Sequence, residues 1–359
     1  MNAPEKSTPL LSVQGLSKHF ALKGSLLASL TRKPNNKVRA VDGVDFEVYE
    51  GETLGVVGES GCGKSTTARL LMHLIAPTGG SVRFEGQKVG SDLSLKAFHS
   101  QVQMVFQDSY ASLNPRLTIA DSVAFGPQVH GVPREASLAR AHDLLQRVGL
   151  EPARFAGRYP HELSGGQRQR VNIARALALQ PRLIILDEAV SALDKSVEAQ
   201  VLNLLLDLKQ EFGLTYIFIS HDLNVVRFMS DRVMVMYLGQ VAEVGPSEDL
   251  FKAAGHPYTQ ALLKSLPATD PDHRTQEAPL LGDPPNPIDP PSGCRFHPRC
   301  SKASEVCATS IPSSIALSTQ HRVSCLIHQK GSGHPLANEQ PIANDHQYAG
   351  ASAVSQVAT

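Results

Sequence analysis

Three short stretches of the chain carry residue types suited to binding and cleaving a phosphate anhydride. The first, GESGCGKS from Gly58 to Ser65, matches the phosphate-binding P-loop pattern G-x-x-x-x-G-K-[ST]. Its glycines let backbone N–H groups face phosphate oxygens, and a following helix adds positive potential. Lys64 can reach the β- and γ-phosphates, and the Ser65 hydroxyl can ligate Mg²⁺. The residues expected to contact a nucleotide here are Gly58, Glu59, Ser60, Gly61, Cys62, Gly63, Lys64, Ser65 and Thr66.

The second stretch is an acidic pair, Asp187 and Glu188, which ends the apolar run Leu183 to Leu186. One carboxylate at such a strand end can hold Mg²⁺, and the other can orient or deprotonate the attacking water. Taken alone, such a pair is more often a helix cap or a solvated turn. Beside a P-loop, a catalytic pair is the favoured interpretation.

The third stretch is LSGGQRQR, from Leu163 to Arg170. Ser164, followed by Gly165 and Gly166, is expected to open a helix, so backbone N–H groups and a hydroxyl would face outward and could donate to phosphate. An ordinary N-cap with a glycine turn is the alternative.

The elements that must position these stretches alternate between strands and helices. A short apolar run between turn residues indicates a buried strand, whereas apolar residues at helical spacing indicate an amphipathic helix. Such alternation predicts a mostly parallel α/β sheet, which binds phosphate ligands at the carboxyl ends of its strands. The expected strands are Leu10–Gln14, Val44–Val48, Thr53–Val57, Leu183–Leu186, Leu214–Ile219 and a hairpin of Arg232–Tyr237 with Val241–Val244; the expected helices include Thr66–Leu74, Val197–Phe212 and His256–Leu266.

Composition excludes several classes of function. The 359 residues contain 42% apolar residues, enough for a substantial core, and 34 basic residues balance 34 acidic ones. A nucleic-acid-binding domain usually has a basic excess, so this balance disfavours that class. No stretch reaches the roughly 18 uncharged apolar residues of a membrane-spanning helix, and the N-terminus lacks the layout of a signal peptide. We expect a cytoplasmic protein that reaches a membrane only through partner chains.

Together the three stretches resemble the ATP-binding cassette (ABC) proteins, of which LSGGQ is the signature motif. The resemblance implies an α/β P-loop NTPase cassette with a RecA-like mixed sheet core and a helical subdomain at about 108–178. It also implies roles for Gln107 (MVFQD), which contacts Mg²⁺ and the membrane partner, and for His221 (FISHD), which contacts the γ-phosphate. Phe20 (LSKHF) would stack on adenine, and Ser191 to Asp194 (SALD) would cross between paired cassettes.

In this family, ATP lies between the P-loop of one cassette and the signature of another. The implied catalytic residues are Glu188, His221 and Lys64, and the implied signature contacts are Ser164, Gly165, Gly166 and Gln167. Because the chain holds one copy of each motif, a second, identical or homologous ATPase subunit must supply the other cassette.

Four stretches, two of them after residue 255, indicate one group within the ABC proteins. HPYTQALLKSLP from His256, PHELSGGQ from Pro160, FQDSYASLNPR from Phe106 and GCRFHPRC from Gly293 resemble the ATPases of oligopeptide and dipeptide importers. The expected organisation is a cassette at 1–255, a C-terminal extension at 256–330 that contains a proline-rich linker at 267–293, and a disordered tail at 331–359. The implied partners are two integral-membrane permease subunits and an extracytoplasmic substrate-binding protein, with this chain on the cytoplasmic face of the inner membrane.

Four of the five cysteines crowd the extension: Cys294, Cys300, Cys307 and Cys325. Four thiolates can bind zinc or an iron–sulfur cluster. Structural zinc sites usually show cysteine pairs about two to four residues apart, and the spacing here is wider. Because some members of the peptide-importer family carry a [4Fe–4S] cluster in this region, the resemblance favours that cluster over zinc or four free thiols.

Other functions stay open at this point. The cargo of such an importer could instead be a nickel complex or a glutathione-like molecule, since specificity lies mainly in the binding protein and the permease. A cassette acting on DNA or the ribosome is disfavoured because those chains typically carry two cassettes or a long insertion. An exporter's cassette is more often fused to membrane helices, which the chain lacks.

Overall fold

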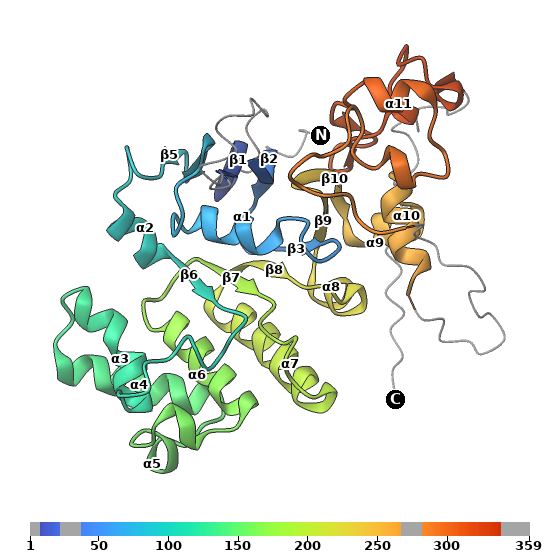
Figure 1. Ribbon diagram of the computed structural model, residues 1–359. Coiled ribbons are helices and arrows are strands. Elements are labelled where there is room, and N and C mark those ends of the chain that lie inside the picture. The colour runs from blue at the N-terminus through green and yellow to red at the C-terminus, as the bar shows by residue number, and fades with distance from the viewer. Residues whose placement is uncertain (1–7, 22–36, 267–281, 339–359) are drawn as a thin grey trace, which may run out of the picture.

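The computed structural model describes residues 8–21, 37–266 and 282–338 (Figure 1). Within these ranges the strands form a four-stranded sheet, in the order β2-β1-β4-β5, and an eight-stranded sheet, in the order β11-β12-β10-β9-β3-β8-β7-β6. The predicted α/β cassette fold is confirmed. The described helices include none that is both long and apolar enough to cross a membrane.

The centre of the larger sheet is parallel, in the order β9-β3-β8-β7-β6. Its strands are β3 (Thr53–Val57), β6 (Val102–Val105), β7 (Leu183–Asp187), β8 (Thr215–Ile219) and β9 (Arg232–Tyr237). Every residue of β3, β7 and β8 is buried, because helices and a second sheet cover both faces. This double burial explains why the sequence shows continuous apolar runs here instead of alternation.

Strand β7 shows how one sheet serves two cores. Leu183 and Ile185 face a cluster that includes helix α1 and the smaller sheet, whereas Ile184 and Leu186 face a cluster built with the helices on the other side. Successive side chains of a strand point to opposite faces, so an all-apolar strand supplies both layers.

The smaller sheet is antiparallel and consists of β1 (Leu11–Ala21), β2 (Lys37–Val48), β4 (Gly79–Phe84) and β5 (Gln87–Lys88). The strands predicted at 10–14 and 44–48 are therefore only parts of longer ones. Their outer halves carry polar residues, and cross-strand pairs such as His19 with Arg39 continue the ladder where the apolar pattern has ended. Residues 22–36, between these strands, lie outside the described residues.

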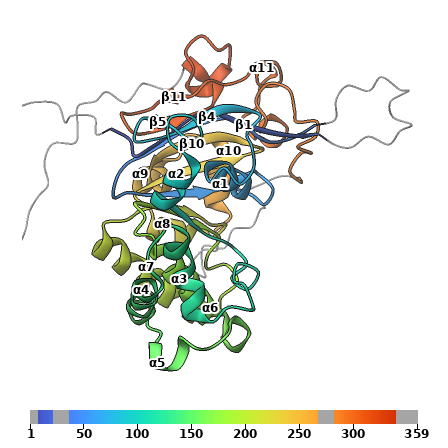
Figure 2. The ribbon, with the colours of Figure 1, turned by 90° about the vertical axis from the view of Figure 1, so that its left-hand side faces the viewer.

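Helices cover the larger sheet, and a helical group projects from its end (Figures 1 and 2). The projecting group, α3 to α6, falls within the range 108–178 expected for a helical subdomain. The bounds up to β9 are α1 (Lys64–Leu71), α2 (Leu95–Gln101), α3 (Ile119–Val129), α4 (Arg134–Arg147), α5 (Pro152–Phe155), α6 (Gly165–Leu177), α7 (Lys195–Phe212) and α8 (Leu223–Met229).

The C-terminal extension continues the larger sheet. Strand β12 pairs with β10 through Glu243 with Val323, and β11 pairs with β12. Beyond β9 the elements are β10 (Gln240–Pro246), α9 (Ser247–Ala253), α10 (Pro257–Lys264), a 3₁₀ helix at His297–Arg299, α11 (Glu305–Thr309), β11 (Ile315–Ala316), β12 (Arg322–Val323) and further 3₁₀ helices at Leu326–His328 and Pro335–Asn338. The extension is thus built on the cassette's own sheet edge.

The predicted disordered tail needs one correction. Residues 331–338 are ordered: Pro335–Asn338 forms a 3₁₀ helix, and His334 and Ala337 are buried. The ring of His334 bonds to the Lys302 carbonyl oxygen, 32 positions away, so this segment is held by a tertiary contact that composition does not reveal. Residues 339–359 lie outside the described residues, as do residues 267–281 of the proline-rich stretch.

Candidate functional site

The P-loop connects the end of β3 to the start of α1 and lies close against neighbouring backbone. Gly63 caps α1 with φ 109°, and a Cβ placed there would come within 2.3 Å of the Ala40 carbonyl oxygen. At Gly58, a Cβ would lie 2.2 Å from the Met236 carbonyl oxygen. Only glycine fits at these two positions, because a side chain would strain the backbone and collide with carbonyl groups.

Lys64 is nearly buried inside the loop that contains it. Its ammonium donates to the carbonyl oxygens of Gly58, at 2.7 Å, and Glu59, at 3.1 Å. Cys62 is also buried; burial raises the pKa of its thiol, against the lowering effect of Lys64. The carbonyl contacts hold the lysine where phosphate groups would enter, and the neutral thiol acts as a small apolar filler.

Ser65 and Asp187 meet at the position expected for a metal ion. The Ser65 hydroxyl donates to Asp187 Oδ1 at 2.9 Å. Burial raises the pKa of Asp187, with a further rise from Glu188, while the Ser65 hydrogen bond lowers it. A hydroxyl and a carboxylate beside a phosphate-binding loop are the hard oxygen donors that Mg²⁺ prefers, so these two residues fit the ion as its protein ligands.

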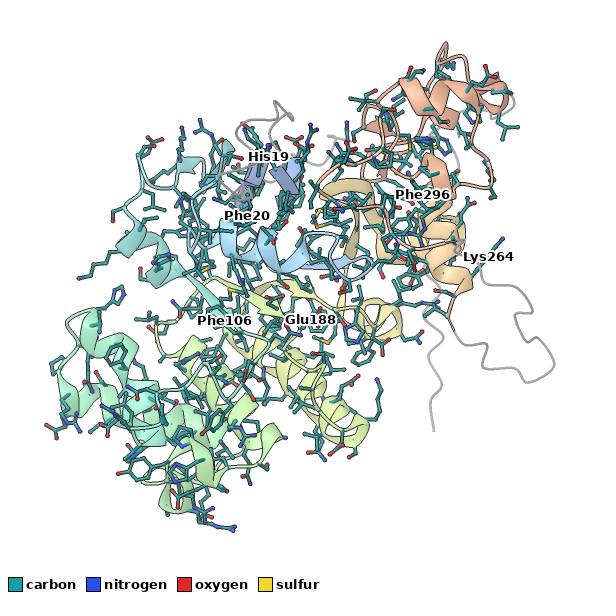
Figure 3. All side chains as sticks on the ribbon, in the orientation of Figure 1. His19, Phe20, Phe106, Glu188, Lys264 and Phe296 are labelled. Carbon is teal, nitrogen blue, oxygen red and sulfur yellow. The ribbon has the colours of Figure 1, made fainter. Side chains whose placement is uncertain are left out.

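The side chains of Gln107 and His221 both approach one carboxylate oxygen of Glu188. Glu188 Oε2 accepts from Gln107 Nε2 at 3.1 Å and lies 3.4 Å from His221 Nδ1. The three residues follow β6, β7 and β8, whose carboxyl ends lie side by side in the sheet. Figure 3 shows Glu188 and Phe106, the neighbour of Gln107, at the centre of the molecule between the sheet and the helical group. Residues spread over more than a hundred positions therefore form one polar cluster.

The backbone at Glu188 is strained. Its φ is 48°, a left-handed conformation that a side chain disfavours. The backbone N–H of Glu188 donates to the Ile219 carbonyl oxygen at 3.0 Å, and its carbonyl oxygen accepts from the Ser191 hydroxyl at 3.0 Å. These bonds fix the turn that aims the carboxylate at Gln107 and His221. Strain held in this way is typical of functional residues.

The signature stretch opens α6 as predicted. Ser164 accepts from the Gln167 N–H, and the Gln167 side chain accepts from the Ser164 N–H at 3.0 Å, which is a capping box. A Cβ at Gly166 would lie 2.5 Å from Val197 Cγ1, so this glycine lets α6 approach α7. In the part of the chain that the structure describes, no hydrogen bond or ion pair joins Ser164–Gln167 to the P-loop. Within the described part of one chain, the signature stretch and the P-loop therefore make no direct polar contact.

Comparison with known proteins identifies the family of the chain. The ABC transporter family model matches residues 41–191, and the model for the oligopeptide/dipeptide transporter C-terminal region matches residues 242–307. A probable peptide ABC transporter ATP-binding protein of Sinorhizobium fredii is 50% identical, over 89% of this chain and 90% of its own length. The chain belongs to the oligopeptide/dipeptide family of ABC transporter ATP-binding proteins.

Further relatives agree with this family. The oligopeptide transport ATP-binding protein AppF of Bacillus subtilis is 47% identical, over 90% of this chain and 99% of its own length. A dimeric structure of a bacterial ABC transporter cassette aligns with 31% identity and TM-score 0.57, over 66% of this chain and 98% of that one. A structure of cbiO1 from Clostridium perfringens, described as part of the ABC transporter complex cbiONQ, aligns with 27% identity and TM-score 0.58, over 68% of this chain and 91% of that one. This ABC subunit hydrolyses ATP in a reaction coupled to transport.

Phe20 of this ABC subunit lies on β1, 40% exposed, opposite Val38 of β2. Two residues further along β2, the Ala40 carbonyl oxygen faces Gly63 of the P-loop. Figure 3 labels Phe20 on this sheet, and the Lys18 ammonium lies over its ring, 5.1 Å from the centroid. A role for Phe20 in stacking on adenine stays a prediction.

The four cysteines of the extension come together in the fold. Burial, together with the three other cysteines, raises the pKa of Cys325 to about 12. Burial also raises the pKa of Cys294 to about 11. The Cys294 N–H donates to the Cys307 carbonyl oxygen at 2.8 Å. No three histidine, cysteine or acidic side chains of the described residues are arranged as metal ligands. The structure brings the thiols near one another without a preformed metal site.

Two residues that contact the P-loop were not expected from the sequence. The Arg299 guanidinium pairs with the Glu59 carboxylate, and the Tyr258 hydroxyl accepts from the Glu59 N–H. Tyr258 lies in HPYTQALL and Arg299 in GCRFHPRC. These stretches indicated the family and a candidate cysteine site, but no contact with the P-loop. Contacts across 240 and 199 residues leave no local pattern by which to find them.

Proposed function

We propose that this chain powers the import of di- and oligopeptides across the cytoplasmic membrane. ATP hydrolysis, the first part of this function, is supported by the meeting of Gln107, Glu188 and His221 beside the P-loop. The cargo rests on the C-terminal region, which matches the oligopeptide/dipeptide transporter model, and on relatives named as peptide transport proteins. A nickel complex and a glutathione-like molecule are the alternative cargoes.

In the proposed reaction, ATP phosphates fill the P-loop. The Lys64 ammonium, held by the carbonyl oxygens of Gly58 and Glu59, reaches the β- and γ-phosphates. Ser65 and Asp187 would hold Mg²⁺, which would offset phosphate charge. Glu188 orients or deprotonates the water that attacks the γ-phosphorus, because its carboxylate is aimed from the adjoining strand end. His221, which is largely exposed beside Glu188, contacts the γ-phosphate and stabilises the charge that develops there.

A second cassette completes each nucleotide site. Within the described part of one chain the signature makes no direct polar contact with the P-loop, so Ser164–Gln167 of a partner ATPase is proposed to close over the γ-phosphate. The capping box leaves the other N–H groups at the start of α6 free to donate to an anion. The partner is a homologous or an identical chain.

Hydrogen bonds link the segment after Gln107 to the signature helix. The Asn172 side chain donates to the Ser109 carbonyl oxygen at 3.0 Å, and Arg175 donates to the Ser112 carbonyl oxygen. Both donors lie on α6, the helix that Ser164 opens. We propose that two integral-membrane permease subunits contact the surface near Gln107, so that cassette closure moves them. The chain would then lie on the cytoplasmic face of the membrane, and an extracytoplasmic binding protein would deliver the cargo.

The cysteine cluster carries a separate proposal. Four thiols gathered in one region could hold a [4Fe–4S] cluster or zinc once deprotonated, although no ligand set is prearranged, and the proposed reaction needs neither. Iron, sulfide and zinc analysis of anaerobically purified protein tests it. About four irons and four sulfides per chain would support the cluster, and their absence would contradict it.

The cargo is tested with the complete transporter in proteoliposomes, with the binding protein added and ATP inside the vesicles with the cassettes. Labelled di- and oligopeptides should accumulate and should raise the ATPase rate, whereas a complex carrying Glu188→Gln should accumulate none. Accumulation of a nickel complex or glutathione, without any response to peptides, would contradict peptide import while leaving the ATPase assignment intact.

A further inference from the structure

Glu59, the second residue of the P-loop, is held at three of its groups. Its N–H donates to the Tyr258 hydroxyl at 2.9 Å, and its carbonyl oxygen accepts from Lys64 at 3.1 Å. Its carboxylate accepts two bonds from Arg299, at 2.7 Å to Oε2 and 3.0 Å to Oε1. The contacts to Tyr258 and Arg299 come from α10 and the extension, beyond the residues matched by the ABC transporter model.

Arg299 is set rigidly for this contact. Its side chain is 5% exposed, and the paired geometry is a bidentate guanidinium–carboxylate bridge. The 3₁₀ helix His297–Arg299, between Cys294 and Cys300, presents it. Its hydrogen bonds to the Glu59 carboxylate raise the pKa of the guanidinium, so Arg299 stays charged at neutral pH.

Aromatic rings support the same contact. Tyr258 lies against Tyr237 with ring centroids 4.6 Å apart and against Phe296 at 5.3 Å. Arg299 also donates to the Tyr237 hydroxyl at 3.3 Å. Figure 3 shows Phe296 beside α10, where the extension meets the sheet. Packed aromatic side chains therefore support the residues that contact Glu59.

The bridge reaches the phosphate-binding lysine through one peptide group. Arg299 fixes the side chain of Glu59, the fixed residue places its own carbonyl oxygen, and that oxygen holds Lys64. A loop that moved among several conformations would bind ATP more weakly, in proportion to the fraction of time spent in the competent one. A loop already fixed from outside avoids that loss.

We propose that Arg299 is a positioning residue for nucleotide binding, through which the C-terminal extension keeps the P-loop in its ATP-binding conformation. The proposal concerns ATP binding and is independent of the cargo. The extension would then position the P-loop through Arg299. This role does not depend on what the cysteines bind.

The test measures ATP affinity and turnover in the full-length chain. Arg299→Met removes the bridge, Arg299→Lys keeps the charge without the bidentate geometry, and Glu59→Gln weakens the bridge from the other side. Arg322→Met is the matched control, because Arg322 lies in the same extension and contacts Ser314. A fluorescent ATP analogue reports Kd, and the assembled transporter reports KM and kcat.

We expect Arg299→Met to raise the Kd and KM for ATP on the order of tenfold, a typical coupling between sites, with kcat at saturating ATP within about twofold. Arg299→Lys should recover part of the affinity, and Arg322→Met should match wild type. Adding Glu59→Gln to Arg299→Met should cause little further loss, because both changes act on one bridge.

Unchanged Kd in Arg299→Met would overturn the proposal, as would losses by Arg299→Met and Glu59→Gln that simply add. A fall in kcat with unchanged KM would also overturn it. If Arg299→Met does not fold, Arg299→Lys and Glu59→Gln decide the matter, and normal ATP affinity in both would exclude a positioning role.

Discussion

His256 gives a sharp test of how the extension docks on the cassette. It caps α10, where its Nδ1 accepts from the Tyr258 N–H at 3.0 Å, and it is buried. Burial, with a smaller effect from His328, lowers its pKa from the usual 6.5 to about 4, against the opposing effect of Glu243. The folded chain thus keeps this imidazole neutral, while the unfolded chain protonates it near pH 6.5.

The sign of the pH dependence follows directly. Between pH 6.5 and 4 the unfolded state binds the extra proton, so stability falls as pH falls through this window. At pH 5, 1.5 pH units below 6.5, one such histidine costs about 2 kcal/mol. His256→Asn keeps a side-chain acceptor for the helix cap and does not titrate.

Urea unfolding at pH 7.5 and pH 5.0 measures the difference. From pH 7.5 to pH 5.0, the free energy of unfolding of wild type should fall by about 2 kcal/mol more than that of His256→Asn. The effect of the carboxylates cancels because both proteins contain them. His142→Asn, which replaces an exposed histidine of α4 far from His256 in the sequence, serves as the control. Equal losses in wild type and His256→Asn would refute a buried, neutral His256.

Two further predictions concern the nucleotide site. Ser65→Ala should weaken ATP binding on the order of tenfold when Mg²⁺ is present and by less than about twofold in EDTA, because the lost hydroxyl serves the metal; equal losses in both conditions would contradict this role. Gly166→Ala should lower the ATPase rate of paired cassettes at least about tenfold while leaving nucleotide binding by the chain's own P-loop unchanged, since a Cβ there would lie 2.5 Å from Val197 Cγ1 and displace the start of α6. Normal turnover in that variant would show that α6 tolerates the shift.

The central strands could be predicted because burial on both faces leaves a plain pattern. The run at 53–57 is strand β3 itself, and the runs at 183–186 and 214–219 differ from β7 and β8 by one residue each. Helix α1 begins at Lys64, two residues before the predicted Thr66, because Gly63 caps it and the last P-loop residues form its first turn. Residues at these strand ends meet because neighbouring parallel strands share an edge.

Tertiary contacts decide the parts that could not be predicted. Strands β11 and β12 have two residues each and exist because β10 offers an edge, so no periodicity marks them. The outer half of β1 is polar and becomes a strand through its pairing with β2. The bridge from Arg299 to Glu59 joins residues 240 positions apart, and the His334 ring bonds to the carbonyl oxygen of Lys302, 32 positions away.

Single-turnover ATP hydrolysis by the full-length chain with its partner ATPase tests the catalytic assignment most directly. Glu188→Gln keeps the size of the side chain and an oxygen that Gln107 can still bond, but removes the carboxylate. ATP affinity should stay within about twofold of wild type, and the hydrolysis rate should fall by about a hundredfold or more, as expected for loss of a general base. Hydrolysis at the wild-type rate by Glu188→Gln would contradict the account.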